Sequence, residues 1–214
     1  MSNSRENILK KIRKALNEST PIPFPQSEGN SMVYQPQSGE LEVQFAEEFS
    51  KLLGKFVFCL DEAELIGRLL HVIHGNQWNK VFCTEKNLQK LFEIGSFPLD
   101  SKLTLKDCEV SVTSCESLVA RTGTIVMSAA QSNGRTASVY APVHICIAYT
   151  SQLVYDLRDA LQRLKDKYQQ KIPSMVTFAS GPSRTADIEK TLVVGVHGPK
   201  EVYVFLVDEP VGNP

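Results

Sequence analysis

Apolar residues follow two patterns along the chain: they recur at helical spacing in some stretches and form short unbroken runs in others. The runs are rich in β-branched and aromatic residues and predict strands at 56–60, 80–83, 109–113, 124–127, 144–149, 175–179, 192–196 and 202–207. The helical spacing predicts helices at 3–18, 41–53, 61–73, 85–92, 115–120 and 151–168. Because strands and helices alternate, we expect an α/β fold, a mainly parallel sheet with helices on both faces.

The first forty residues differ from the rest. Residues 3–18 place an apolar stripe (Ile8, Leu9, Ile12, Ala15, Leu16) opposite a basic face (Arg5, Lys10, Lys11, Arg13, Lys14), with Asn3 and Glu6 spaced as a capping box. Residues 19–40 contain Pro21, Pro23, Pro25, Gly29, Pro36 and Gly39, which is typical of an extended arm. We therefore predict two parts, a helix with a proline-rich arm over 1–40 and an α/β domain over 41–214.

A short basic amphipathic helix has two readings. It binds a membrane surface or partner, or it packs on its own domain or on a second subunit. The helix at 3–18 lacks an aromatic anchor, which favours packing on protein. A homo-oligomer is one expected consequence, since the arm would let the helix reach a neighbouring subunit.

Composition excludes several classes of protein. The chain has 214 residues, 42% of them hydrophobic and 22% charged, which is ordinary for a globular domain. A net charge of -1 argues against a nucleic-acid binder. No apolar run approaches the roughly 18 residues that span a bilayer, and the N-terminus lacks the apolar core of a signal peptide. We expect a cytoplasmic protein without a membrane span.

The five cysteines form an odd set with no C-x-x-C pair: Cys59, Cys83, Cys108, Cys115 and Cys146. Three of them lie in apolar strand-like runs, where a free thiol acts as a small hydrophobic group. We expect a reducing compartment and no disulfides. The spacing of Cys108 and Cys115 does not match zinc or iron–sulfur patterns, so no metal or cluster is predicted in this chain.

Residues 180–200 carry the densest chemistry, with a Gly-Pro step at each end of the stretch. Near its start, Gly181 allows close backbone approach, and Ser183, Arg184 and Thr185 supply two hydroxyls and a guanidinium. If a helix began near Thr185, its free amides would complete an anion site. The alternative is an Arg184–Asp187 pair that only stabilises a tight turn.

Two other loops carry anion-binding candidates. Thr122, Gly123 and Thr124 combine hydroxyls with a glycine that can expose backbone amides, although an ordinary turn has the same sequence. Arg135 follows an Asn-Gly turn and would close over an anion, or lie solvated on a hairpin. Because these loops and 180–187 all follow predicted strands, we expect them to meet at one crevice beyond the carboxyl ends of a parallel sheet.

The catalytic candidates are His197 and Asp187. His197 lies at a strand end and suits general acid–base work, whereas His144, between apolar residues, is interpreted as a core residue. Asp187 is expected to orient Arg184. Neither histidine belongs to an H-E-x-x-H arrangement, and the chain has no Walker loop, G-x-S-x-G or G-x-G-x-x-G motif.

Three stretches carry a family resemblance: SGPSRTADIEKTLVVGVHGPK at 180–200, TGTIVM at 122–127 and APVHICIAY at 141–149. In order and with compatible gaps, they resemble the lactate utilisation protein C (LutC) or LUD domain family. The resemblance covers roughly the C-terminal half and implies the fold of the NagB/RpiA/CoA-transferase group. The chain departs from the pattern at Arg121, where relatives tend to carry glutamate; Glu116 nearby is a candidate substitute.

The resemblance implies a subunit that takes part in oxidising L-lactate to pyruvate beside separate iron–sulfur partner proteins. The clusters are expected in those partners, and a small anionic ligand is expected in this chain. Two alternatives stay open: a free-standing CoA-transferase-like enzyme acting on a phosphorylated or CoA-linked metabolite, and a purely structural or regulatory subunit. Fold analogy does not decide whether the chain is itself an enzyme.

Overall fold

The computed structural model of the chain describes residues 4–17, 37, 39–100, 102–132, 135–188 and 191–209. The chain divides into two compact units, residues 1–38 and residues 39–214. In the first unit, α1 (Ser4–Asn17) forms as predicted and its apolar side chains Ile8, Leu9 and Ile12 are exposed. Within the described ranges, no helix combines the length and apolar character needed to cross a membrane.

The second unit is built on a five-stranded sheet whose strand order is β1-β11-β6-β3-β2. Its strands are β1 (Lys55–Cys59), β11 (Glu201–Val207), β6 (Val143–Tyr149), β3 (Val110–Thr113) and β2 (Val81–Phe82). All four neighbouring pairs are parallel. The predicted mainly parallel α/β sheet is therefore confirmed, and its three inner strands, β11, β6 and β3, are largely buried.

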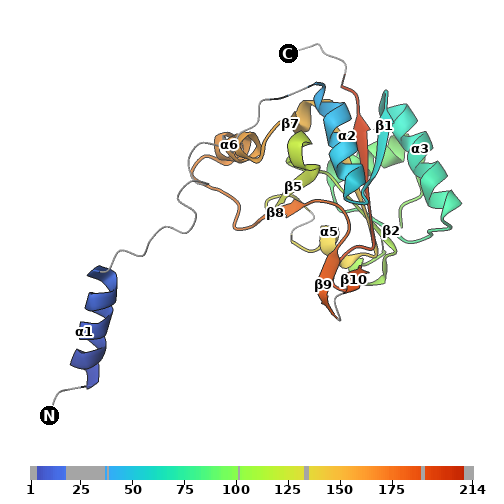
Figure 1. The fold of residues 1–214 in the computed structure, drawn as a ribbon. Helices are drawn as coiled ribbons and strands as arrows, with labels where there is room; N and C mark the ends of the chain where they lie inside the picture. The colour runs from blue at the N-terminus through green and yellow to red at the C-terminus, as the bar shows by residue number, and fades with distance from the viewer. Residues whose placement is uncertain are drawn as a thin grey trace. The chain divides into compact units, whose positions relative to one another are not determined.

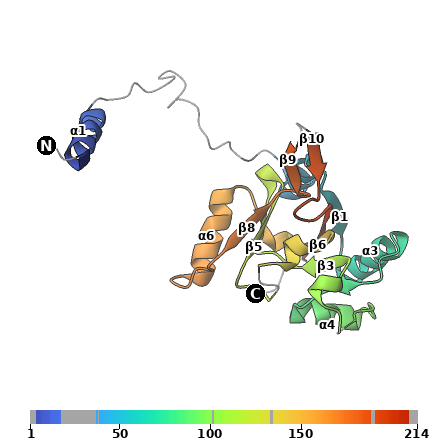
Figure 2. The same cartoon turned by 90° about the horizontal axis from the view of Figure 1, so that it is seen from below.

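Helices α3 (Glu62–Gly75) and α4 (Lys86–Ile94) cover one face of the parallel sheet (Figure 2). Their apolar stripes pack against alternate strand residues such as Ile145 and Phe205. The helix α3 begins after Asp61, whose carboxylate caps it by accepting the Glu64 backbone N–H at 2.7 Å. The opposite face is covered by α2 (Leu41–Lys51) and by a second sheet.

The second sheet has the order β7-β4-β5-β8 and was not predicted. Its strands are β7 (Leu153–Val154), β4 (Ser117–Val119), β5 (Thr124–Ser128) and β8 (Val176–Ala179). One face packs on the parallel sheet and α2, and α6 (Leu157–Tyr168) covers the other face, which makes a layered domain (Figure 1). Short elements complete the domain: α5 (Ala137–Tyr140), η1 (Leu105–Asp107), η2 (Ala120–Thr122) and η3 (Thr150–Gln152).

Two helix predictions were wrong because tertiary pairing overrode local pattern. Residues 115–120 were predicted as a helix, but β4 pairs antiparallel with β5 and parallel with β7. The helix predicted at 151–168 begins only at Leu157. There the Asp156 carboxylate accepts the Arg158 N–H at 2.9 Å and caps the helix, while the preceding residues belong to η3 and β7.

The helix considered near Thr185 is also absent from this part of the chain. Residues there form β9 (Arg184–Ile188), which pairs antiparallel with β10 (Thr191–Val194) in a separate hairpin, drawn at the lower edge of Figure 1. The strand predicted at 192–196 ends at Val194, because Gly195 follows with a φ of 75°. A helix N-terminus therefore does not contribute to an anion site beside Arg184.

Candidate functional site

The segment from 180 to 200 lies at the amino edge of the parallel sheet. Before β11, the Lys200 N–H donates to the Pro142 carbonyl, which precedes β6, at 2.7 Å. The Ser183 N–H donates to the Pro199 carbonyl at 3.0 Å, and the Gly195 N–H donates to the Ser183 carbonyl at 2.8 Å. We predicted this segment at the carboxyl edge because it follows a strand at 175–179. That strand is β8 of the second sheet, so the expectation was wrong.

A cleft of about 390 Å³ opens beside this segment, and we call it the His197 cleft. It is lined by Val139, Tyr140, Pro142, Gly195, Val196, His197, Gly198 and Lys200. His197 and Lys200 are both exposed. The described lining contains an imidazole, an ammonium and a phenol but no carboxylate, so it favours a small anion. Ser183 adjoins the cleft, because a Cβ at Gly198 would lie 2.8 Å from its Cβ.

A cluster of three hydroxyls continues from the same segment. Thr124 Oγ1 lies 2.7 Å from Thr122 Oγ1 and 2.7 Å from Ser180 Oγ. Gly123 has a φ of 54°, and a Cβ there would lie 2.5 Å from the Phe49 backbone nitrogen. Gly181 likewise has a φ of 83° and adjoins the Leu52 carbonyl. Both glycines are therefore required by close packing on the end of α2, whatever else they do.

The arginines singled out in the sequence lie in different places. Arg184 is exposed and donates to the Leu52 carbonyl at the end of α2, where a cation complements the helix dipole. Arg135 donates to Ser174 Oγ at 2.6 Å. The structure thus joins Thr122, Thr124, Gly181 and Ser183 along one strip but gives Arg135 a different partner. The side chains of Thr185 and Asp187, and residues Asn133 and Gly134, lie outside the described part of the chain.

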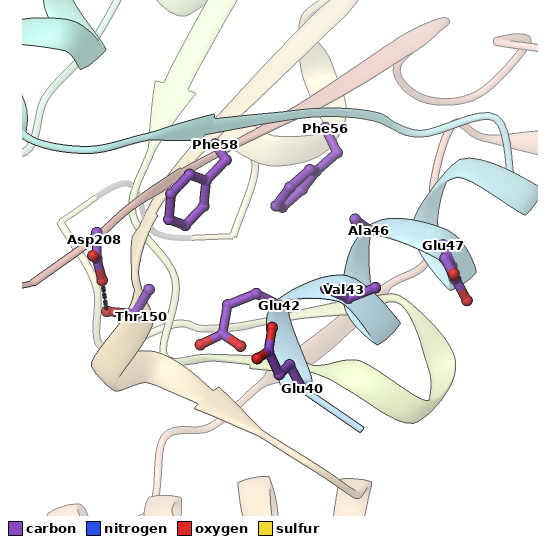
Figure 3. A pocket seen from close by; sticks show the side chains of 9 residues that line it. All are labelled: Glu40, Glu42, Val43, Ala46, Glu47, Phe56, Phe58, Thr150 and Asp208. Carbon is purple, nitrogen blue, oxygen red and sulfur yellow. Dashed lines mark hydrogen bonds between the residues drawn. The ribbon is translucent and has the colours of Figure 1, made fainter. Parts of the chain in front are cut away.

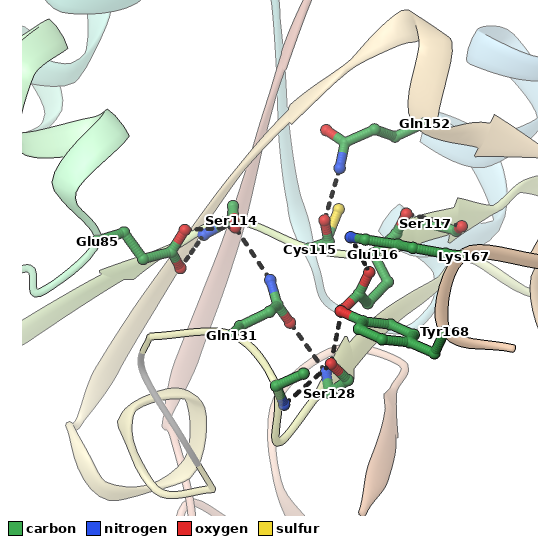
Figure 4. A network of polar contacts seen from close by, with 11 residues as sticks. Glu85, Ser114, Cys115, Glu116, Ser117, Ser128, Gln131, Gln152, Lys167 and Tyr168 are labelled. Carbon is green, nitrogen blue, oxygen red and sulfur yellow. Dashed lines mark hydrogen bonds and ion pairs between the residues drawn. The ribbon is translucent and has the colours of Figure 1, made fainter. Parts of the chain in front are cut away.

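A second polar region lies at the carboxyl edge of the parallel sheet (Figure 4). Buried Glu85, which follows β2, accepts the Ser114 backbone N–H at 2.8 Å and its hydroxyl at 2.5 Å. Gln131 donates to Ser114 Oγ at 2.9 Å and accepts the Ser128 N–H at 2.9 Å. These bonds join the loops after β2, β3 and β5. The three predicted loops therefore meet at two places, not at one crevice.

Glu116 extends this region, which we call the carboxyl-edge network. One oxygen accepts from Ser128 Oγ at 2.5 Å and from the Tyr168 hydroxyl at 2.7 Å, and the other from Lys167 Nζ at 2.7 Å. Burial alone would raise the pKa of Glu116, but donation by Lys167, Ser128 and Tyr168 outweighs burial and lowers it. The carboxylate is thus held ionised and fully hydrogen-bonded.

Arg121 forms an ion pair within the domain. Its Nε lies 2.5 Å from Asp156 Oδ2, beside the start of α6. Hydrogen bonding by the Arg158 N–H, followed by Arg121, lowers the pKa of Asp156 despite its burial. Glu116, the candidate substitute named from the sequence, does not lie beside Arg121 on a helix, because 115–120 is not helical. Its carboxylate bonds to the α6 residues Lys167 and Tyr168.

His144 and the cysteines lie in the interior. His144 is fully buried with Nε2 2.9 Å from Thr113 Oγ1, and desolvation lowers its pKa to about 4. All five cysteines are buried free thiols. Burial raises the pKa of Cys83 to about 12, which leaves a poorly reactive thiol. Within the described ranges, no three His, Cys, Asp or Glu side chains are grouped to hold a metal ion.

Sequence reasoning missed Lys200, Tyr140 and the Glu85–Ser114 pair. Lys200 directly follows the second Gly-Pro step and was the overlooked cation of that stretch. Glu85 and Ser114 are among the first polar residues after two strands that prove to be neighbours, β2 and β3. Since the carboxyl ends of parallel strands share an edge, that position was the available signal.

Fold and site together define an α/β protein with a parallel sheet, a second sheet layered on it and a basic cleft at the amino edge. The LUD domain family model matches residues 100–207, half of the chain. The chain belongs to the LUD domain family.

Several relatives match about half of the chain or less. Lactate utilization protein C of Shouchella clausii is 33% identical over 114 residues, 51% of this chain and 50% of that protein. Its namesake in Bacillus licheniformis is 36% identical over 106 residues, 48% of this chain and 44% of that protein. An uncharacterized protein of Neisseria meningitidis serogroup B is 36% identical over 89 residues, 42% and 38% of the two chains. The chain matches about half the length of these curated relatives or less.

A solved structure supports the fold. The crystal structure of a DUF162 family protein from Deinococcus radiodurans aligns with a TM-score of 0.58 at 21% identity, covering 80% of this chain and 99% of that one. At that identity the likeness concerns the fold alone.

Proposed function

We propose that the chain is a LutC-like subunit that takes part in the oxidation of L-lactate to pyruvate together with iron–sulfur partner proteins. Two relatives are named lactate utilization protein C, which supports the pathway. The His197 cleft supports a role for this chain in binding the substrate. Its described lining has cationic and hydroxyl groups and no carboxylate.

In this proposal the cleft holds the lactate carboxylate and positions its hydroxyl. Lys200 pairs with the carboxylate, and the Tyr140 hydroxyl adds a hydrogen bond. His197 accepts the hydroxyl proton as a general base. Oxidation to pyruvate releases two electrons and two protons. The iron–sulfur clusters expected in the partner proteins would accept the two electrons. His197 would pass the hydroxyl proton to water, and the hydrogen on C2 would leave as the second proton.

A larger cavity of about 700 Å³ lies beside α2 and β1, but its lining does not suit the lactate carboxylate. Four carboxylates line it: Glu40, Glu42, Glu47 and Asp208. Like charges around a carboxylate oppose its binding. We therefore place the lactate site in the His197 cleft because of the charge of its lining, although the other cavity is larger.

The test is purification of the tagged protein from its own host grown on lactate, under gentle conditions. We expect brown iron–sulfur proteins to co-elute and the preparation to reduce a dye when L-lactate, but not D-lactate, is added. A colourless, partner-free protein without lactate-dependent reduction would overturn the proposal. Melting curves with CoA, sugar phosphates and folates would then test the free-standing enzyme, since ligand at about a hundred times its Kd stabilises the fold by roughly 2.7 kcal/mol.

A further inference from the structure

A cavity of about 700 Å³ lies between α2 and the edge strand β1, and we call it the α2–β1 groove (Figure 3). Phe56 and Phe58 project into it from β1, and Val43 and Ala46 face it from α2. Two of these apolar side chains are exposed, Val43 to 53% and Phe58 to 37%, whereas Phe56 and Ala46 are half-buried. An apolar floor of this kind on a protein surface marks a contact site.

The rim of the groove is acidic. Glu40 and Glu42 lie at the start of α2, Glu47 lies further along, and Asp208 follows β11. Figure 3 shows Glu40 and Glu42 beside the apolar floor. An occupant must therefore present an apolar stripe flanked by cationic side chains.

The helix α1 has that chemistry. Its residues Ile8, Leu9 and Ile12 form an exposed stripe at i, i+1 and i+4. Five basic side chains accompany the stripe on the same helix: Arg5, Lys10, Lys11, Arg13 and Lys14. A helix with an apolar stripe docks into a groove through anchors at this spacing. Charge and apolarity thus match on the two surfaces.

We propose that α1 of a second copy of this chain docks in the α2–β1 groove, so that two copies exchange helices. The sequence of the arm has alternate prolines at 21, 23 and 25, a pattern that favours a semi-rigid, extended segment and therefore disfavours folding back onto the same copy. Exchange between two copies is reciprocal, and both apolar stripes are covered in a closed dimer. This inference does not depend on the proposed lactate function, since its readout is the oligomeric state.

Sedimentation equilibrium of the full chain tests the proposal with single variants at exposed positions. Ile12→Glu alters the helix, Val43→Glu alters the groove, and Ile94→Glu is the matched control, because Ile94 is 85% exposed at the end of α4. We expect a wild-type dimer whose dissociation constant rises at least about a hundredfold in the first two variants and stays unchanged in the control. Added salt should also weaken the dimer.

Mixing the two variants separates exchange from other contacts. The Ile12→Glu copy keeps an intact groove and the Val43→Glu copy keeps an intact helix, so the mixture should form heterodimers although neither variant dimerises alone. A monomeric wild-type chain, a dimer that survives both variants, or a mixture without heterodimers would each overturn the proposal. A monomer would point to docking within one chain.

Discussion

The two polar regions at opposite edges of the parallel sheet differ in how their groups are satisfied. In the carboxyl-edge network, Glu116 accepts three hydrogen bonds, and Ser114 is bonded to both Glu85 and Gln131. At the amino edge, His197 and Lys200 are exposed side chains around an open cleft. The polar groups of the first region are hydrogen-bonded within the protein, whereas His197 and Lys200 in the second region are open to solvent.

A group of closely spaced polar side chains is therefore not in itself a ligand site. Two buried side-chain atoms lack a hydrogen-bond partner among the described residues, Gln44 Oε1 and Ser111 Oγ, and neither belongs to the carboxyl-edge network. A saturated buried network stabilises the fold, and its loss is measured in stability. Substituting an exposed residue of the His197 cleft should instead lower activity and leave stability unchanged.

The largest expected effect is on the network. Glu116→Ala removes the acceptor shared by Ser128, Tyr168 and Lys167, and we expect the free energy of unfolding to fall by about 4 kcal/mol. Urea unfolding measures it. Lys167→Met is the control: the lysine is 60% exposed, so its removal should cost less than about 1 kcal/mol. Equal losses in the two variants would contradict a network centred on Glu116.

The second effect is a pH dependence of the free energy of unfolding that arises from His144. Desolvation lowers its pKa in the folded state from 6.5 to about 4. Between these values the unfolded chain binds more protons, so stability is complete above about pH 6.5 and decreases as the pH falls. The loss approaches about 3 kcal/mol near pH 4. Urea midpoints from pH 5 to 7.5 should show this slope in the wild type. The same slope in His144→Asn would rule out His144 as its source.

A smaller effect on stability is expected at Gly123, which packs against the backbone of α2. Gly123→Ala forces a Cβ into a left-handed conformation against the Phe49 backbone, which should destabilise the fold by about 2 kcal/mol. Gly67→Ala is the control, because its Cβ meets nothing within 4 Å in α3 and should stabilise the helix by roughly 0.5–1 kcal/mol. Thermal melts of both variants measure the difference. A neutral Gly123→Ala would show that the backbone there shifts freely.

Much of this fold was predictable from local pattern. Strands such as β1, β6 and β11 were found because they lie in short apolar runs, and α3 because its apolar residues recur at helical spacing. The second sheet was missed because β4 and β7 are only three and two residues long. Such strands exist through pairing with distant partners, and periodicity does not report those partners.

The site was predicted in part. Ser183 and His197 were chosen as candidate site residues because 180–200 combines several polar residues with two Gly-Pro steps. In the structure both lie beside one cleft. Its edge was misassigned because 175–179 was placed in the wrong sheet, and Arg135 was grouped with residues it does not contact in the described structure. Which loops meet depends on strand order, and strand order is set by contacts between residues far apart in the chain.

The most direct measurement is lactate-dependent dye reduction by the assembled preparation carrying His197→Ala, beside a His71→Ala control. His71 is an exposed histidine on α3 and does not line the His197 cleft, so it is a matched control. We expect His197→Ala to reduce the rate of dye reduction about a hundredfold at an unchanged melting temperature, and the control to leave the rate unchanged. Full activity of His197→Ala in an intact assembly would contradict this expectation.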